Sequence, residues 1–332
     1  MGIASGKNEI AGRENSIGDI DPFSGLLPAA GRVTGGQGKR VKTKTAAGPD
    51  ERHILILNCP DQKGVVAAVS GFLADNNGSI TESNHFNDAI VGQFYMRTVF
   101  RPDGAMPSAA ALKAGFELIA QRFSMNWSLH EAAARPKVLI AVSKFGHCLF
   151  DLLHRWRAGL LPAEIVGVVS NHEDLRSFVE WSGVPFHHLP VTPATKSEQE
   201  ARFMALVDQH GADLIVLARY MQILSAAMCA SLAGRCINIH HSFLPGFKGA
   251  KPYHQAYDRG VKIIGATAHY VTTDLDEGPI IEQGVQRVDH SQGPDQLVEL
   301  GRDIECQVLA RAVCWHVEHR VLIQGGKTII FA

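Results

Sequence analysis

An alternation of apolar runs with helix-like segments dominates the chain after residue 136. Strand-like runs lie at 137–143, 164–170, 186–189 and 214–218, and helical patterns lie between them at 148–157, 175–182 and 198–210. Strands buried on both faces read as continuous apolar runs, and their alternation with helices is typical of a parallel sheet. The alternation therefore predicts a doubly wound α/β domain over residues 136–332, whose ligands bind beyond the carboxyl ends of its strands.

Residues 51–131 show a different order of elements, which predicts a second and smaller domain. Strands are expected at 53–58, 80–86, 92–100 and near 126–130, helices from Val65 and over 107–124, and a hairpin turn at Asn87-Asp88. The resulting order βαββαβ is that of a ferredoxin-like fold. The segment Ala132–Pro136 would join the two domains.

The first fifty residues carry no periodic apolar pattern and are rich in Gly, Ser, Lys, Arg and Pro. This composition predicts a mostly disordered extension of residues 1–50, in which the basic stretch Gly35–Lys44 could bind an anion. The extension lacks the apolar core of a secretory signal, and its acidic residues argue against an organelle transit peptide. We therefore expect a cytoplasmic protein.

The overall composition narrows the class of protein. Hydrophobic residues make up 45% and charged residues 20% of the chain, as in a globular protein, and the net charge of -1 argues against a nucleic-acid partner. No apolar run approaches the roughly 20 residues that span a bilayer. The six cysteines form no Cys-x-x-Cys pair, so buried free thiols are expected.

Two short motifs carry the groups that acyl-transfer chemistry requires. The first is Asn238-Ile239-His240-His241-Ser242-Phe243-Leu244-Pro245, and the second is Asp276-Glu277-Gly278-Pro279. An amide can hold a developing oxyanion, an imidazole can move a proton, and a carboxylate can orient the nucleophile. Asn238 and His240 are two residues apart, so on a strand they share one face. The alternative interpretation is that Asn238 caps a strand end and His240 is a core histidine.

This ordered set closely resembles the signature of the folate-dependent formyltransferases, which bind 10-formyltetrahydrofolate. The match extends to His269-Tyr270-Val271 and to Gly278-Pro279. The resemblance implies that Asn238, His240 and Asp276 form the catalytic set. Asn238 and protonated His240 would then stabilise the oxyanion, and Asp276 would position His240 and the attacking water and accept the proton of that water.

The segment Arg219–Leu224 resembles the part of the family's pocket that reads the pterin ring. The resemblance implies folate binding by Gln222, Ile223 and Leu224, with His269 close to the pocket. The alternative is that Met221, Ile223 and Leu224 are simply core residues. Lys248 or Lys251 could approach the glutamate tail of the folate. The histidines lack metal-site spacing and the family's chemistry needs no metal, so no metal or cofactor is expected, the folate being the substrate.

The smaller domain resembles the ACT domain, a regulatory module that pairs edge to edge and binds amino acids. Its loop Asp61, Gln62, Lys63 and Gly64 enters the first helix, where backbone N–H groups can receive a carboxylate. The resemblance implies an effector such as glycine or methionine and a homo-oligomer, a dimer or tetramer. The alternative is a ligand-free module that serves only to dimerise.

Over residues 53–332 the chain resembles the formyltetrahydrofolate deformylases, in which an ACT domain is fused to a formyltransferase-like domain. The resemblance implies hydrolysis of 10-formyltetrahydrofolate to formate and tetrahydrofolate, which supports purine synthesis and balances the one-carbon pool. Two alternatives are a glycinamide ribonucleotide formyltransferase and an amino-acid-responsive binding protein with an inactive catalytic half. The turn Ser143–Cys148 favours the hydrolase, because bulky Phe145 and His147 would crowd a phosphate.

Overall fold

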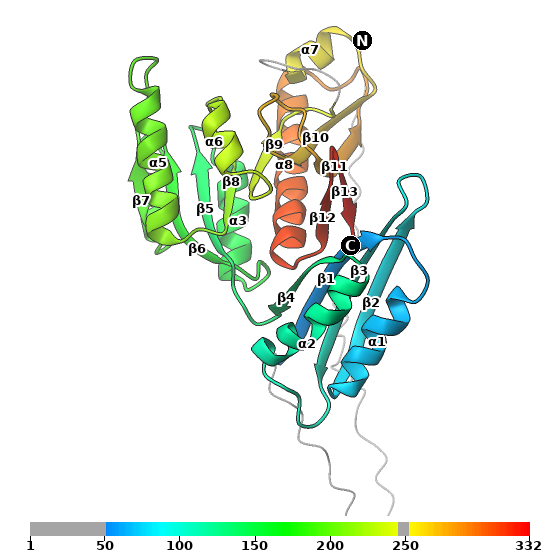
Figure 1. The fold of residues 1–332 in the computed structure, drawn as a ribbon. Helices are drawn as coiled ribbons and strands as arrows, with labels where there is room; N and C mark the ends of the chain where they lie inside the picture. Colours follow the sequence, from blue (N-terminus) through cyan, green and yellow to red (C-terminus); the bar gives the residue numbers. More distant parts are fainter. Residues whose placement is uncertain (1–50, 245–251) are drawn as a thin grey trace, which may run out of the picture. The chain divides into compact units, whose positions relative to one another are not determined.

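The computed structural model describes residues 51–244 and 252–332, which form sheets of four, seven and two strands (Figure 1). The expected N-terminal extension with its basic stretch, Pro245 and the two loop lysines, Lys248 and Lys251, lie outside the described residues. None of the described helices is long and apolar enough to cross a membrane.

The four-stranded antiparallel sheet comes from residues 53–131 and has the strand order β2-β3-β1-β4. Its elements are β1 (His53–Pro60), α1 (Val65–Asp75), β2 (Gly78–Asp88), β3 (Gln93–Pro102), α2 (Ala109–Arg122) and β4 (Asn126–Glu131). This confirms the predicted ferredoxin-like βαββαβ order. We call these residues the N-terminal module.

The hairpin of the N-terminal module turns later than predicted. Asn87 and Asp88 still pair with Phe94 and Gln93, so the turn lies at residues 89–92. The Asp88 carboxylate accepts a hydrogen bond from the backbone N–H of Ile90 at 3.0 Å. Asp88 therefore starts the turn and does not occupy its centre, which is a common use of aspartate.

The seven-stranded sheet has the order β11-β10-β9-β8-β5-β6-β7. Five of its strands are parallel, as predicted: β5 (Lys137–Val142), β6 (Glu164–Ser170), β7 (Phe186–His188), β8 (Leu214–Leu217) and β9 (Cys236–His240). The sheet is not parallel throughout, because β10 (Ile263–Tyr270) and β11 (Ile280–Arg287) run antiparallel to their neighbours. The sheet is therefore mixed, with an antiparallel edge, as is common in doubly wound folds.

Helices cover both faces of this sheet, as a doubly wound fold requires. They are α3 (His147–Arg157), α4 (Arg176–Trp181), α5 (Lys196–His210), α6 (Ala226–Ser231), α7 (Pro252–Asp258) and α8 (Pro294–Val317). Alternate residues of β5 enter different cores. Val138 and Ile140 pack with α3, α4 and α8, whereas Leu139 and Ala141 pack with α5 and α6. A final hairpin, β12 (Val321–Gln324) with β13 (Lys327–Ile330), follows α8.

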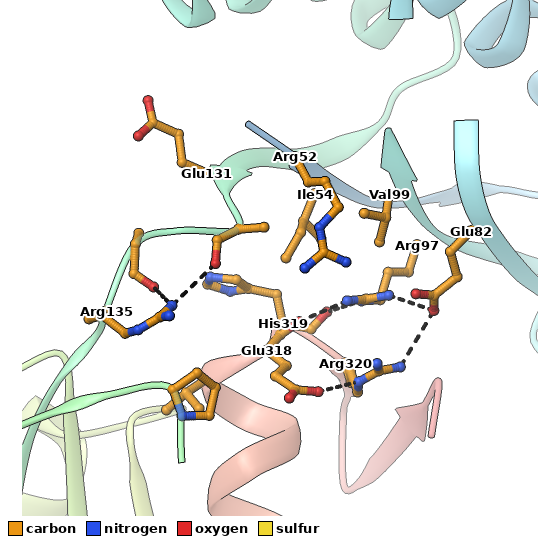
Figure 2. A pocket seen from close by; sticks show the side chains of 14 residues that line it. Arg52, Ile54, Glu82, Arg97, Val99, Glu131, Arg135, Glu318, His319 and Arg320 are labelled. Carbon is orange, nitrogen blue, oxygen red and sulfur yellow. Dashed lines mark hydrogen bonds and ion pairs between the residues drawn. The ribbon is translucent and has the colours of Figure 1, made fainter. Parts of the chain in front are cut away.

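The N-terminal module supplies the cap at the carboxyl end of α8. Arg97 of β3 is only 3% exposed and lines a cavity of about 240 Å³ (Figure 2). Its Nε donates to the carbonyl of His319 and its Nη2 to that of Glu318, both at 3.1 Å, while Nη1 pairs with Glu82 at 2.7 Å. A cation satisfies the last carbonyls of a helix and its negative dipole end. The burial of Arg97 thus joins the sheet of the module to α8.

We expect Arg97→Met to destabilise the protein by about 3 kcal/mol, because it breaks the ion pair with Glu82 and leaves the carbonyls of Glu318 and His319 without the donor that Arg97 provides. The measurement is the urea concentration at the midpoint of unfolding. Arg101→Met is the matched control, since Arg101 lies exposed on the same strand. Equal midpoints for the two variants would contradict a capping role for Arg97.

Candidate active site

A cavity of about 300 Å³ lies at the carboxyl ends of β8 and β9. All seven predicted catalytic and folate-binding residues line it: Asn238, His240, Asp276, Gln222, Ile223, Leu224 and His269. These residues come from three separate segments of the chain. Their convergence on one concave site at the carboxyl ends of strands is the arrangement expected for a ligand pocket in an α/β fold.

His240 ends β9 and contacts Asp276 through one ring nitrogen. Its Nδ1 lies 3.2 Å from Oδ1 of Asp276, and the His240 side chain is 6% exposed. The other nitrogen, Nε2, is buried and has no hydrogen-bond partner among the residues that the structure describes. A buried polar atom without a partner is costly, so Nε2 is suited to bond a group of a bound ligand.

His269 fixes the orientation of Asn238. Its Nδ1 lies 2.9 Å from the carbonyl of Tyr270, which can only accept, so Nδ1 carries the proton. In the neutral ring Nε2 is then an acceptor, and it lies 3.3 Å from Nδ2 of Asn238. The same Nε2 lies 3.7 Å from Oδ1 of Asp276. Asn238 therefore turns its NH2 group toward His269, and His269 holds the Asn238 side chain in this orientation.

Asp276 is held as a carboxylate by its contact with His240. Burial alone would raise the pKa of Asp276, but that contact outweighs burial and lowers the pKa well below its usual range. The site thus contains a fixed negative charge next to the imidazole of His240.

The Asp-x-Gly-Pro turn has a steric reason for its residues. Asp276 has a φ of +58°, which is the left-handed region that few non-glycine residues adopt. A Cβ added at Gly278 would overlap the carbonyl oxygen of Tyr270. Tyr270 in turn donates its N–H to the carbonyl of Pro279 at 2.9 Å. The turn is therefore pressed against the end of β10, which brings the carboxylate of Asp276 back to His240.

The segment Arg219–Leu224, which was predicted to read the pterin ring, follows β8 and is bonded to the residue that follows β5. Ser143, just after β5, accepts a hydrogen bond from the N–H of Met221 at 3.0 Å and donates to Asn171 at 2.7 Å. Met221 and Ile223 are 52% and 63% exposed, so the alternative reading of both as core residues is wrong. Exposed apolar side chains at the rim of a cavity are typical of a site for an aromatic ligand.

A buried polar cluster beside the cavity was missed by the sequence analysis as a functional group. Arg219 lines the cavity, and its Nε lies 3.4 Å from Oε2 of Glu305 in α8. Glu305, 1% exposed, also accepts from Nε2 of His147 at 2.7 Å and from the hydroxyl of Tyr253 at 2.9 Å. The sequence contained a signal for Glu305, because its spacing of four residues from Gly301 and Leu309 puts a carboxylate on the buried face of a helix.

The same cluster contains metal-ligand types. Donor atoms of His147, Cys148 and Glu305 lie within 4.8 Å of one another. Glu305 is already bonded by His147 and Tyr253, and the charge of Arg219 beside it opposes a second cation. The group is best explained as a hydrogen-bond network, and the expected lack of a metal stays a prediction.

The predicted regulatory residues lie at the start of α1 and do not line the active-site cavity. Asp61 accepts a hydrogen bond from Asn87 at 2.7 Å, and Gln62 donates to the carbonyl of Phe123 at 3.2 Å. Gly64 caps α1 with a φ of +95°, a conformation that suits glycine. The side chains of Asp61 and Gln62 are thus already bonded within the N-terminal module.

Comparison with known proteins identifies the family. Residues 136–313 match the model of the formyl transferase family. A formyltetrahydrofolate deformylase of Corynebacterium sp. (strain P-1) is 53% identical over 84% of this chain and 98% of its own length. The crystal structure of a formyltetrahydrofolate deformylase from Burkholderia mallei ATCC 23344 covers 86% of this chain and 100% of its own, at 54% identity and a TM-score of 0.82.

A more distant likeness is limited to part of the chain. Glycinamide ribonucleotide transformylase 1 from Symbiobacterium toebii, at 28% identity and a TM-score of 0.57, covers 60% of this chain and 95% of its own. The deformylase structure is thus both more similar and more complete in its coverage. The chain belongs to the formyltetrahydrofolate deformylase family and contains a formyl transferase domain.

Proposed function

We propose that this protein hydrolyses 10-formyltetrahydrofolate to formate and tetrahydrofolate. The observation that carries the proposal is the pair formed by His240 and Asp276. One nitrogen of the imidazole contacts the carboxylate of Asp276. The other is buried without a hydrogen-bond partner among the described residues, in a cavity that Asn238 also lines. This arrangement suits the stabilisation of an oxyanion and the delivery of a proton.

The reaction proceeds from binding of the pterin ring along Gln222, Ile223 and Leu224. The formyl oxygen then lies against Asn238 and the Nε2–H of protonated His240. Water attacks the formyl carbon, and the two donors stabilise the oxyanion that forms. Asp276 offsets the charge of the imidazolium through Nδ1. When the tetrahedral intermediate collapses, His240 protonates the leaving N10 of the folate. The scheme uses no metal or cofactor, because the folate is consumed as the substrate.

Two structural features favour water over a ribonucleotide acceptor. In the turn after β5, His147 is bonded to Glu305, and Phe145 stacks with Arg219 at 5.8 Å. Both bulky side chains are thus held at the turn where a phosphate would have to bind, and they would crowd it. The match to the deformylase of Burkholderia mallei also extends over the N-terminal module, because it covers 86% of the chain. The alternative of a binding protein with an inactive catalytic half conflicts with the assembled site.

A direct assay separates the hydrolase from the transferase. We expect the protein to release formate from 10-formyltetrahydrofolate at a rate that does not depend on added glycinamide ribonucleotide. The measurement is formate and tetrahydrofolate production with and without that acceptor. Formyl transfer to the acceptor in equal amounts, with little hydrolysis in its absence, would show that the protein is a transferase.

The catalytic set is tested by two substitutions. Asp276→Asn removes the charge at nearly constant size, and His240→Ala removes the proton carrier. Each should lower kcat by at least about a hundredfold, because each removes a group that acts in the transition state. Asp208→Asn, on the exposed side of α5, is the control for a lost carboxylate. A folded variant of either site residue with near wild-type formate release would refute the assignment.

We further propose that the N-terminal module is an ACT domain. Its sheet has the edge strands β2 and β4, and an exposed edge is a natural place for pairing with a second copy. A small amino acid such as glycine or methionine would bind at Asp61–Gly64, with its carboxylate on the first N–H groups of α1.

The released formate would supply purine synthesis and balance the one-carbon pool. A cytoplasmic location also stays a prediction.

Calorimetry against glycine, methionine and the other common amino acids tests the regulatory site. We expect heat with at least one of them, and Lys63→Ala should weaken that binding about tenfold through loss of a charged partner. Lys113→Ala, on the exposed side of α2, is the control. If no amino acid gives heat or changes formate release, the module serves only in assembly.

A further inference from the structure

The wall of the active-site cavity contains an arginine whose burial the catalytic set does not explain. The side chain of Arg219 is 10% exposed, and Nη1 has no hydrogen-bond partner among the described residues. Its backbone has a φ of +65°, a region unfavourable for a residue with a side chain. Burying an ion pair also costs desolvation free energy. Two unfavourable features in one residue at a cavity wall indicate a function.

The charge of Arg219 acts on His241, which lines the same cavity. His241 follows His240 directly, and the two ring centroids lie 5.3 Å apart. The groups that face its ring are Arg219, Glu305, His240, Asp276 and, at 6.5 Å between ring centroids, Tyr253. None of the described residues forms a hydrogen bond with the His241 ring.

The surroundings of His241 favour its neutral form. Burial and, after it, the charge of Arg219 lower the pKa of His241 to about 4, although Glu305 and Asp276 act in the opposite direction. A neutral imidazole always has one nitrogen that accepts a hydrogen bond. At neutral pH the cavity thus contains an imidazole that can accept from water, next to the one that donates to substrate.

The proposed hydrolysis needs such an acceptor. Protonated His240 has only donors, and the contact of Oδ1 of Asp276 with His240 leaves that carboxylate a weak base, because it lowers the pKa of Asp276. We infer that His241 holds the attacking water, and that Arg219, anchored by Glu305, is a positioning residue for that imidazole. The inference rests on the proposed function, because it assigns the binding and deprotonation of the attacking water in that reaction to a residue outside the predicted catalytic set.

The proton balance of the step is simple. The oxygen of water forms a bond to the formyl carbon, and His241 takes the proton that this oxygen loses. The bond from the formyl carbon to N10 breaks, and N10 receives the proton of His240. The second proton of the original water leaves to solvent as formic acid ionises. His241 returns its proton through solvent to His240, so both histidines recover their starting states.

Kinetics of the full chain with 10-formyltetrahydrofolate test the role of His241. We expect His241→Phe to lower kcat about a hundredfold with KM changed by less than about threefold, because the ring remains but the acceptor is lost. His241→Asn retains an acceptor oxygen and should recover at least part of that loss. His290→Phe, an exposed histidine outside the cavity, should match the wild type. A His241→Phe variant with wild-type kcat would overturn the inference.

The pH profile of kcat tests Arg219. Arg219→Gln removes the positive charge, so the pKa of His241 should rise from about 4 toward its ordinary value of 6.5. His241 would then become protonated at mildly acid pH, and the acid limb of kcat should move up by at least about one pH unit. Arg219→Lys keeps the charge and should keep the limb in place.

The outcomes also separate this inference from the proposed function. If the wild-type protein releases no formate, the proposed function fails. If the wild type is active but Arg219→Gln and Arg219→Lys lose kcat equally at every pH, with the acid limb unmoved, then Arg219 is merely structural and the inference fails alone.

Discussion

The antiparallel pairing of β9 with β10 sets the geometry on which the site depends. In this register Asn238 lies opposite His269, and His240 lies opposite Thr267. Thr267 is fully buried and bonds the backbone of Ser242 and Leu244, so it holds the loop that follows His240. A shift of one residue would turn every side chain to the other face of the sheet. One strand pair thus determines which amide, imidazole and supporting histidine meet.

The helix α8 connects the chemistry of the site with the stability of the fold. Glu305, near the middle of α8, contacts Arg219 and His147. The carboxyl end of α8 is capped by Arg97 of the N-terminal module. The cap at Arg97 and the anchor at Glu305 therefore belong to one rigid element, which also packs along β10 and β11.

The two adjacent histidines of the cavity have different charged neighbours. Nδ1 of His240 lies against the carboxylate of Asp276, whereas burial and then the charge of Arg219 favour the neutral form of His241. In the proposed mechanism this difference lets one imidazole donate a proton while the other accepts one. Among the residues that the structure describes, Nε2 of His240 and both Nε and Nη1 of Arg219 lack a hydrogen-bond partner, a cost of folding that a bound substrate can offset.

Much of this protein was determined by local sequence. Continuous apolar runs were enough to predict β5 to β8, and the order of elements predicted the βαββαβ module, because strand burial and helix periodicity are local properties. The resemblance of the motifs around Asn238, His240 and Asp276 to the formyltransferase signature predicted that these three side chains belong to one site, and all three line one cavity. Only the tertiary structure decided that β10 and β11 run antiparallel, that Glu305 meets Arg219 across 86 residues, and that Arg97 caps α8. These features depend on which distant segments pack together, and the free energy of that packing is shared among many residues and is not encoded in any short motif.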